Sequence, residues 1–150
     1  MASIAAWQKT VNQWAVEKGW RGPAATPRTI GDEVALIHSE ASEVLEAFRD
    51  NPDPKAIWYT YTVEIEGVKF PNMSRDQLRI LLNCDEDELD DNIAELGLEG
   101  KPEGFGPEMA DIAIRLLDNA EHHGLDLETL IAQKMNHNRT RPFQHGGKTI

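Results

Sequence analysis

Two pairs of carboxylates have a spacing that suits chemistry, because each pair lies on one face of a helix. Glu40 and Glu43 belong to the stretch SEASE, and Glu108 and Asp111 belong to the stretch GPEMAD. Residues three apart on a helix are neighbours on its surface. Clustered carboxylates repel one another unless a cation lies among them, and oxygen ligands without histidine or cysteine suit Mg²⁺, with Mn²⁺ as a substitute. The two pairs therefore predict a divalent metal site.

Glu40 is the most informative of these acids, because its position conflicts with its charge. At about 100° of turn per residue, the apolar residues of 35–48 form one arc, and Glu40 points into it while Glu43 lies on its edge. A buried carboxylate without a compensating partner costs several kcal/mol. Glu108 and Asp111 fall off the apolar arc of their own helix, so a solvated acidic edge is the alternative interpretation of that second pair.

Two polar residues interrupt the apolar stripe of the last expected helix. Lys134 and Asn138 continue the stripe that starts at Leu127, where leucines are expected. Either the helix end leaves the core and Lys134 reaches water, or both residues line a pocket and bind phosphate oxygens. Further cations follow close behind them: Arg139, Arg141 and Lys148. A pocket with acids on one wall and bases on another would suit a metal-bound triphosphate.

Four long helices are expected to position these residues. Apolar spacing and end signals place them at about 4–19, 30–49, 107–123 and 126–139. Thr29 and Asp126 are the expected N-caps of the second and fourth helices. Residues 56–71 are rich in β-branched and aromatic side chains and predict a β-hairpin that turns at Glu66-Gly67, with two short helices after it.

This layout predicts a mainly α fold in one domain spanning residues 1–150. A helical core carries an inserted hairpin and short helices at about residues 51–106, and a 150-residue chain can bury about two-thirds of its unfolded surface. The segment EGKPEGFGP is interpreted as a proline- and glycine-rich linker at the end of the insertion. Trp7 and Trp14 are at helical spacing and are expected in the core.

The composition excludes several classes of function. A net charge of −11 speaks against general binding of nucleic-acid polymers, which depends on Lys and Arg. No apolar stretch approaches the ~20 residues that cross a bilayer, and the first residues carry no secretory signal. A single cysteine, Cys84, excludes an internal disulfide and suits a reducing cytoplasm.

In their order along the chain, these motifs resemble the MazG-like, all-α nucleoside triphosphate pyrophosphohydrolases. The matching stretches are SEASE, GPEMAD and KMNHNRTRPFQHGGK, and the resemblance covers roughly residues 4–50 and 100–148. It implies a four-helix core of that type and Mg²⁺-dependent cleavage of a (deoxy)nucleoside triphosphate between its α- and β-phosphates. The products would be the monophosphate and pyrophosphate. The family often has a second glutamate before Glu40, where this chain has Ser39.

The resemblance implies metal ligands at Glu40, Glu43, Glu108 and Asp111. Glu43, with Glu40 beside it, is the candidate to orient or deprotonate the attacking water. The candidate phosphate-binding residues are Lys134, Asn138, Arg141 and Lys148, and the candidates for contact with the base are Trp20 and Arg28. A homodimer or higher homo-oligomer is expected, because four such helices leave apolar surface uncovered.

Two other functions fit the same sequence. The acid-rich insertion, especially DEDELDD, would suit a non-catalytic adaptor that binds a basic partner protein. A nucleotide sensor on the same helical fold, which binds without turnover, would suit the unusual Ser39. The adaptor does not explain why Glu40, Lys134 and Asn138 occupy apolar stripes.

Overall fold

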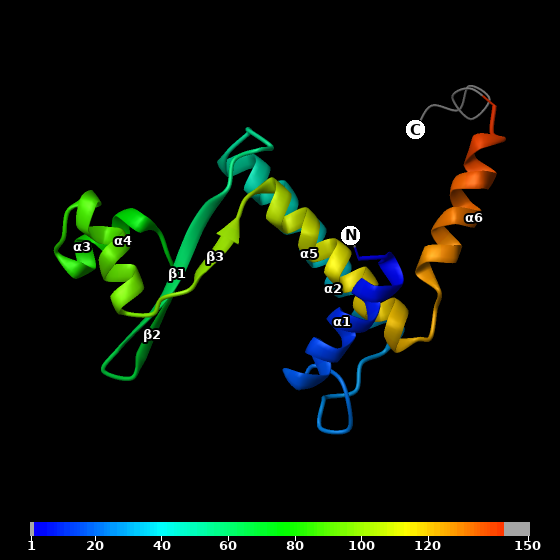
Figure 1. Cartoon of the computed structure of the whole chain (residues 1–150), viewed down its shortest axis with the longest axis horizontal. Helices are drawn as coiled ribbons and strands as arrows, with labels where there is room; N and C mark the ends of the chain where they lie inside the picture. Colours follow the sequence, from blue (N-terminus) through cyan, green and yellow to red (C-terminus); the bar gives the residue numbers. More distant parts are fainter. Residues whose placement is uncertain (1, 143–150) are drawn as a thin grey trace. The chain divides into compact units, whose positions relative to one another are not determined.

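The computed structural model describes residues 2–142 of the chain, and Figure 1 shows their helices and strands. The described elements are α1 (Ile4–Glu17), α2 (Ile30–Asp50), β1 (Trp58–Ile65), β2 (Val68–Met73), α3 (Arg75–Leu82), α4 (Glu86–Glu95), β3 (Gly100–Glu103), α5 (Phe105–His122) and α6 (Leu127–Arg139). The expected mainly α character is confirmed, whereas a four-helix core of the MazG type stays a prediction. None of the described helices is long and apolar enough to span a membrane.

The chain divides into two compact units. One unit is Ser39–Asp111, and the other combines the residues up to His38 with those from Ile112 onward. The second half of α2 and the first turns of α5 therefore belong to the Ser39–Asp111 unit, together with the whole sheet and the two short helices.

The expected hairpin is confirmed, but its sheet has a third strand. β1 pairs antiparallel with β2 on one side and with β3 on the other. Glu66 and Gly67 both have positive φ, 51° and 79°, which is the backbone of a type I′ turn. The expectation that EGKPEGFGP is only a linker is wrong, because Gly100–Glu103 pairs with β1. Pro102 is tolerated there because β3 is an edge strand.

One face of this sheet is covered by the two short helices. Tyr61 and Val63 of β1 pack with Leu78 of α3 and Leu89 of α4 in a small core, and both leucines are completely buried. The side chains of Ser74 and Asp85 cap α3 and α4, each within a capping box that also uses the third residue of its helix.

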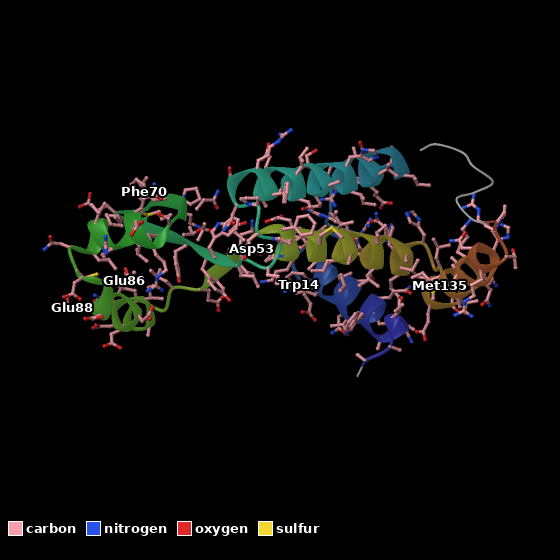
Figure 2. All side chains as sticks on the ribbon, turned by 90° about the horizontal axis from the view of Figure 1, so that it is seen from above. Trp14, Asp53, Phe70, Glu86, Glu88 and Met135 are labelled. Atoms are coloured by element: carbon pink, nitrogen blue, oxygen red, sulfur yellow. The ribbon has the colours of Figure 1, made fainter. Side chains whose placement is uncertain are left out.

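Several acids of the insertion have local structural partners. Arg75 of α3 forms ion pairs with Glu86 (3.0 Å) and Asp90 (2.7 Å) of α4, and the labels of Figure 2 place Glu86 and Glu88 on α4. Glu88 accepts a hydrogen bond from the backbone N–H of Asp85 in the capping box. These contacts join α3 to α4 and give part of the acidic run a role in the fold.

In the other unit, α1 contacts α6 around a buried glutamine. The Gln8 side chain is 3% exposed, donates to the carbonyl of Leu125 at 2.8 Å and accepts from the backbone N–H of Leu127 at 3.2 Å. Asp126 caps α6 as expected, because its side chain accepts from the Thr129 N–H. Thr29 likewise accepts from the backbone N–H of Asp32 in the first turn of α2.

The expectation that Trp7 and Trp14 lie in the core is wrong for this chain. Trp7 is 52% exposed and Trp14 is 41% exposed, and Trp14 packs edge-on against Trp20 with 5.5 Å between ring centroids. The buried residues of α1 are Gln8 and Ala15, which lie next to these tryptophans in the sequence. The bulky rings therefore contribute to the surface, and a small side chain contributes to the packing.

The buried face of α2 is rotated from the arc expected from its apolar residues. Ala41, Leu45 and Phe48 of that arc are exposed. The buried residues of α2 follow one another at intervals of seven, four and three positions: Glu33, Glu40, Val44 and Ala47. This spacing keeps residues on one face of a helix. Glu40 is therefore buried, as predicted, on a face that carries a second buried glutamate.

Candidate metal centre

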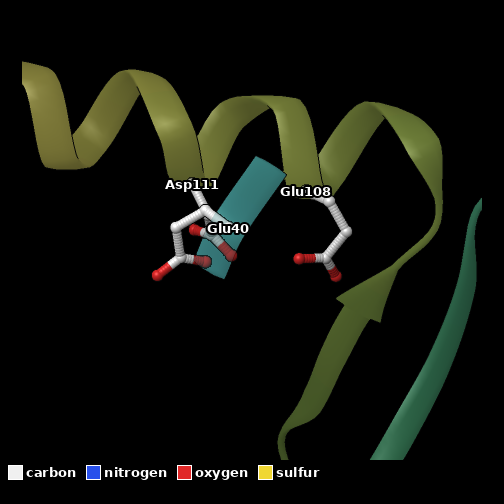
Figure 3. A group of neighbouring side chains, drawn as sticks. All are labelled: Glu40, Glu108 and Asp111. Atoms are coloured by element: carbon white, nitrogen blue, oxygen red, sulfur yellow. The ribbon is translucent and has the colours of Figure 1, made fainter. Parts of the chain in front are cut away.

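Three of the four predicted acids converge in the Ser39–Asp111 unit. Glu40 extends from α2, and Glu108 and Asp111 extend from the first turns of α5 (Figure 3). One carboxylate oxygen from each lies within 4.8 Å of those of the other two. Glu40 is 8% exposed and Glu108 is 3% exposed. The alternative interpretation of Glu108 and Asp111 as a solvated acidic edge therefore fails for Glu108, although that residue lies off the apolar arc.

Glu108 has an oxygen without a hydrogen-bond partner. Its Oε2 is buried and accepts no hydrogen bond from any described residue. A buried polar atom in this condition calls for an explanation such as an ion or a water. Burial, together with a hydrogen bond shared with Glu103, raises the pKa of Glu108 to about 7. The carboxyl group is thus in an environment that disfavours its charge unless a cation is near.

The junction between β3 and α5 fixes the position of Glu108. Gly104 has φ of +127°, and a Cβ atom there would lie 2.5 Å from the carbonyl oxygen of Ala56. Only glycine tolerates this backbone and this close approach. The carbonyl of Gly104 then accepts the Glu108 N–H at 3.1 Å. α5 begins at Phe105, two residues before the predicted start, so Glu108 lies in its first turn.

Glu103 of β3 links the sheet to the carboxylate group. Its side chain accepts hydrogen bonds from Thr60 Oγ1 at 2.9 Å and from Lys101 Nζ at 3.0 Å, and it shares a hydrogen bond with Glu108. Burial alone would raise the pKa of Glu103, but these hydrogen bonds, with the charge of Lys101, lower it. The inserted sheet therefore orients Glu108 through a charged glutamate.

The donor chemistry of this group fits a hard divalent cation. Glu40, Glu108 and Asp111 offer carboxylate oxygens alone, as Mg²⁺ and Mn²⁺ prefer. The buried Oε2 of Glu108 has no hydrogen-bond partner among the described residues and is available as a ligand atom. A cation held here would have room for waters or substrate oxygens in its remaining coordination positions.

Glu43 differs in position from the other three predicted ligands. It is exposed and is not a member of the group of converging oxygens. It lines a cavity of about 350 Å³ in the same unit, and Glu108 lines this cavity too. Its role as a metal ligand or as a base stays a prediction.

The predicted phosphate-binding residues that the structure describes belong to the other unit. Lys134 and Asn138 lie on α6, and Arg141 follows it; all three are exposed, and Lys148 lies outside the described residues. The expectation that the Leu127 stripe of α6 is a core face is not met in this chain, because α6 has no buried residue. Figure 2 labels Met135, which is 54% exposed, on this helix.

The two residues predicted to contact the base lie together. Trp20 and Arg28 line a cavity of about 360 Å³ with Arg21 and His122. Arg21 is buried, and its guanidinium donates to Glu33, to Asp118 and to Asn119. By the bounds of α1 and α2, Trp20, Arg21 and Arg28 belong to the loop between these helices. Figure 1 shows the course of this loop.

Sequence reasoning missed the residues that the inserted sheet brings to the carboxylate group. Thr60, Lys101 and Glu103 lie on β1 and β3, and their register places Thr60 opposite Lys101. Neither Lys101 nor Glu103 is part of a helical pattern, so periodicity could not select them. The only local signal was Lys-Pro-Glu-Gly directly before a predicted helix that carries two acids.

Comparison with known proteins gives no relative. No protein-family model, curated protein or solved structure matches this chain.

Proposed function

We propose that this protein is a divalent-metal-dependent nucleoside triphosphate pyrophosphohydrolase. The observation that carries the proposal is the convergence of Glu40, Glu108 and Asp111, with Oε2 of Glu108 buried and without a hydrogen-bond partner. Such a group is stable when a cation neutralises it. The motif resemblance described above supplies the class of reaction, namely cleavage between the α- and β-phosphates with release of pyrophosphate.

The carboxylates have distinct roles in this proposal. Glu40, Glu108 and Asp111 would hold Mg²⁺, which neutralises phosphate oxygens and lowers the pKa of bound water. Glu43 lines the adjoining cavity and is our candidate to orient or deprotonate the attacking water. Water would form a bond to the α-phosphorus, and the bond from that phosphorus to the bridging oxygen of pyrophosphate would break.

Other parts of the proposal rest on sequence patterns as well as on the resemblance. They are phosphate contacts by Lys134, Asn138, Arg141 and Lys148, base contacts by Trp20 and Arg28, and assembly into a homodimer or larger homo-oligomer. Lys134, Asn138 and Arg141 are exposed and available to an anion. Trp20 and Arg28 line one cavity, which is compatible with a flat aromatic ligand.

The two alternative functions explain less of the structure. An adaptor that binds basic proteins would use exposed acids, whereas Glu40 and Glu108 are buried. Part of the acidic run of α4 is already used in its cap and in pairs with Arg75. A sensor that binds nucleotide without turnover would share the metal group, so only an assay of products separates it from the enzyme.

The deciding experiment is a product assay. The protein is incubated with a panel of ribo- and deoxyribonucleoside triphosphates and Mg²⁺, with and without EDTA, and the products are separated by anion-exchange chromatography. Monophosphate and pyrophosphate in equal amounts, abolished by EDTA, are expected. Bound nucleotide without products would indicate the sensor, and neither binding nor products would indicate the adaptor.

A matched pair of variants connects the activity to the site. Glu40→Gln keeps the size of the side chain but removes its charge, so turnover should fall by at least about 100-fold while the far-UV circular dichroism is unchanged. Glu95→Gln changes an exposed glutamate of α4 in the same unit and should retain full activity. Normal turnover by Glu40→Gln would refute the assignment.

A further inference from the structure

The cavity beside the carboxylate group is built largely by the inserted sheet. It measures about 350 Å³, and its walls include Trp58 and Thr60 of β1 and Lys101 and Glu103 of β3. Glu108 is both a wall of this cavity and a member of the carboxylate group. A ligand in the cavity would thus touch the group from the side of the insertion.

The charge of the cavity restricts what can enter it. Five carboxylates line it, namely Glu43, Glu46, Asp50, Glu103 and Glu108, and Lys101 is the cation among its lining residues. A free polyphosphate would be repelled by these acids. A polyphosphate that arrives with a divalent cation presents positive charge to the carboxylates and negative oxygens to the lysine.

Lys101 has the charge and the freedom to meet a phosphate. Partial burial by itself would lower its pKa, but the hydrogen bond to Glu103 and the charges of Glu103, Glu108 and Asp111 outweigh burial and raise its pKa. The side chain is therefore an ammonium at neutral pH. It is 53% exposed, and Nζ has two further N–H donors beside the one that Glu103 accepts.

The backbone that carries Lys101 is held on both sides. Lys101 pairs with Thr60 in the ladder between β3 and β1, and the residue after Glu103 is the constrained Gly104. The Glu103 carboxylate also accepts a hydrogen bond from the Thr60 hydroxyl, and this bond holds the carboxylate that orients Nζ of Lys101. A donor mounted on a strand in this way is better preorganised than one on a free loop.

We propose that Lys101 of the insertion contacts a phosphate oxygen of the metal-bound nucleoside triphosphate, and that the cavity which it lines receives the triphosphate chain. This inference rests on the proposed function, because it uses the same carboxylate group. It gives the insertion a direct part in substrate binding. It also makes Lys101, which lies outside every motif of the sequence, a substrate-contacting residue.

A different role for Lys101 would be purely structural, as the partner that keeps Glu103 and Glu108 in place. The two roles predict different losses. A structural lysine affects binding of the metal by itself, because Glu108 would shift. A phosphate contact affects binding of the metal–triphosphate complex and leaves binding of the metal by itself unchanged.

The experiment measures three quantities for wild type, Lys101→Ala, Lys101→Arg and the control Lys69→Ala. These are Mn²⁺ binding followed by electron paramagnetic resonance, binding of an α,β-imido nucleoside triphosphate with Mg²⁺ by calorimetry, and the KM and kcat of turnover. Lys69 lies on β2, is 72% exposed and does not line the cavity. Inorganic triphosphate with Mg²⁺ is a second ligand that tests the phosphate chain without a base.

Lys101→Ala should weaken binding of both Mg²⁺–triphosphate ligands and raise KM by about 10- to 100-fold, as expected for loss of a charge-assisted hydrogen bond. Mn²⁺ binding should be unchanged, Lys101→Arg should recover much of the loss, and Lys69→Ala should equal wild type. The inference would be overturned if Lys101→Ala left the affinity and KM unchanged, or if it weakened Mn²⁺ binding as much as binding of the Mg²⁺–triphosphate ligands. Neither result would affect the proposed function, which is tested by hydrolysis in the wild type. If the wild type binds the analogue through Lys101 but releases no pyrophosphate from a nucleoside triphosphate, the proposed function fails and the contact stands. If the wild type does not bind the analogue, the contact is refuted.

Discussion

Glu103 and Glu108 share a side-chain hydrogen bond where β3 passes into α5. Two carboxyl groups can share a hydrogen bond only when one of them carries a proton. The pKa of Glu108 is raised to about 7 by burial and by this bond, whereas that of Glu103 is lowered by its hydrogen bonds with Lys101, Thr60 and Glu108 against the effect of burial. In the metal-free pair, these opposite shifts favour Glu108 as the partner that carries the proton.

The stability of the metal-free protein should depend on this proton. The pKa of Glu108 rises from 4.5 for an ordinary glutamate to about 7 in the folded state, so the folded state binds more protons than the unfolded state between these pH values. Linkage then requires the contribution of Glu108 to the free energy of unfolding to be fully present below about pH 4.5 and to fall as pH rises to about 7. Urea unfolding in EDTA at a series of pH values measures it.

The comparison with Glu108→Gln isolates this contribution from other titrating groups. The variant cannot lose a proton at position 108. As pH rises from about 4.5 to about 7, the free energy of unfolding of wild type should therefore decrease relative to that of Glu108→Gln. Glu95→Gln should follow wild type at every pH. A difference between wild type and Glu108→Gln that does not vary with pH would contradict the raised pKa.

Divalent metal should stabilise the folded protein in a way that depends on the same carboxylates. A ligand that binds only the folded state at 100 times its Kd adds about 2.7 kcal/mol to the free energy of unfolding. Mg²⁺ or Mn²⁺ should therefore raise the thermal midpoint, and EDTA should reverse the shift. Glu40→Gln should abolish the shift, whereas Glu95→Gln should keep it. An equal rise in both variants would point to non-specific screening.

The sequence was sufficient to predict elements that depend on local signals. The hairpin turn at Glu66-Gly67 and the cap at Asp126 follow from local turn and capping preferences, and both are present in the structure. The burial of Glu40 was predicted from the apolar arc of 35–48 and is confirmed, although the buried face of α2 is rotated from that arc. These inferences need only the nearest turn of chain.

Long-range pairing was not predictable in the same way. β3 is four residues long and contains Pro102, so its pairing with β1 is determined by the hairpin and by Gly104 rather than by its own composition. Glu33 gave no signal, because its partner Arg21 lies in a loop that carries no periodic pattern. The contacts that orient Glu108 are also long-range, because they come from β1 and β3, and they were not predictable from local sequence.

Arg21 should be essential for the stability of its unit. Its side chain is 6% exposed and neutralises Glu33, which is 4% exposed, and Asp118, which is 13% exposed. Truncation in Arg21→Ala leaves buried carboxylates without their cation, although His123 remains near Glu33 at 2.7 Å. We expect a loss of about 3–5 kcal/mol in urea unfolding.

An exposed arginine provides the control for this loss. Arg79 of α3 is 39% exposed and forms ion pairs with Asp76 and Glu86, both at 3.5 Å. Arg79→Ala should change the free energy of unfolding by at most about 1 kcal/mol, because exposed pairs are screened by solvent. A similar loss of unfolding free energy in both variants would show that burial does not make the Arg21 ion pairs more stabilising than exposed ones.

Gly104 should be required for the geometry of the site. A Cβ atom in Gly104→Ala would lie 2.5 Å from the Ala56 carbonyl oxygen, at φ of +127°. The junction must shift, at a cost of about 2 kcal/mol or more. Metal binding should weaken because the carbonyl of Gly104 accepts the Glu108 N–H. Gly106→Ala is the matched control, because a Cβ atom there meets nothing within 4 Å and helix propensity favours alanine. Equal behaviour of the two variants would exclude a special role for the junction.

The apolar surface of α6 leads to the last prediction, which is self-association. Leu130, Ile131 and Met135 are 42%, 37% and 54% exposed and lie on one side of the helix. Burial of apolar surface contributes about 25 cal/mol per Å², so a second copy that covers this face would stabilise it. Sedimentation equilibrium should give a multiple of 16.8 kDa. Met135→Glu should lower that mass, whereas Asn136→Glu, on the opposite side of α6, should not; a wild-type monomer at micromolar concentration would contradict the prediction.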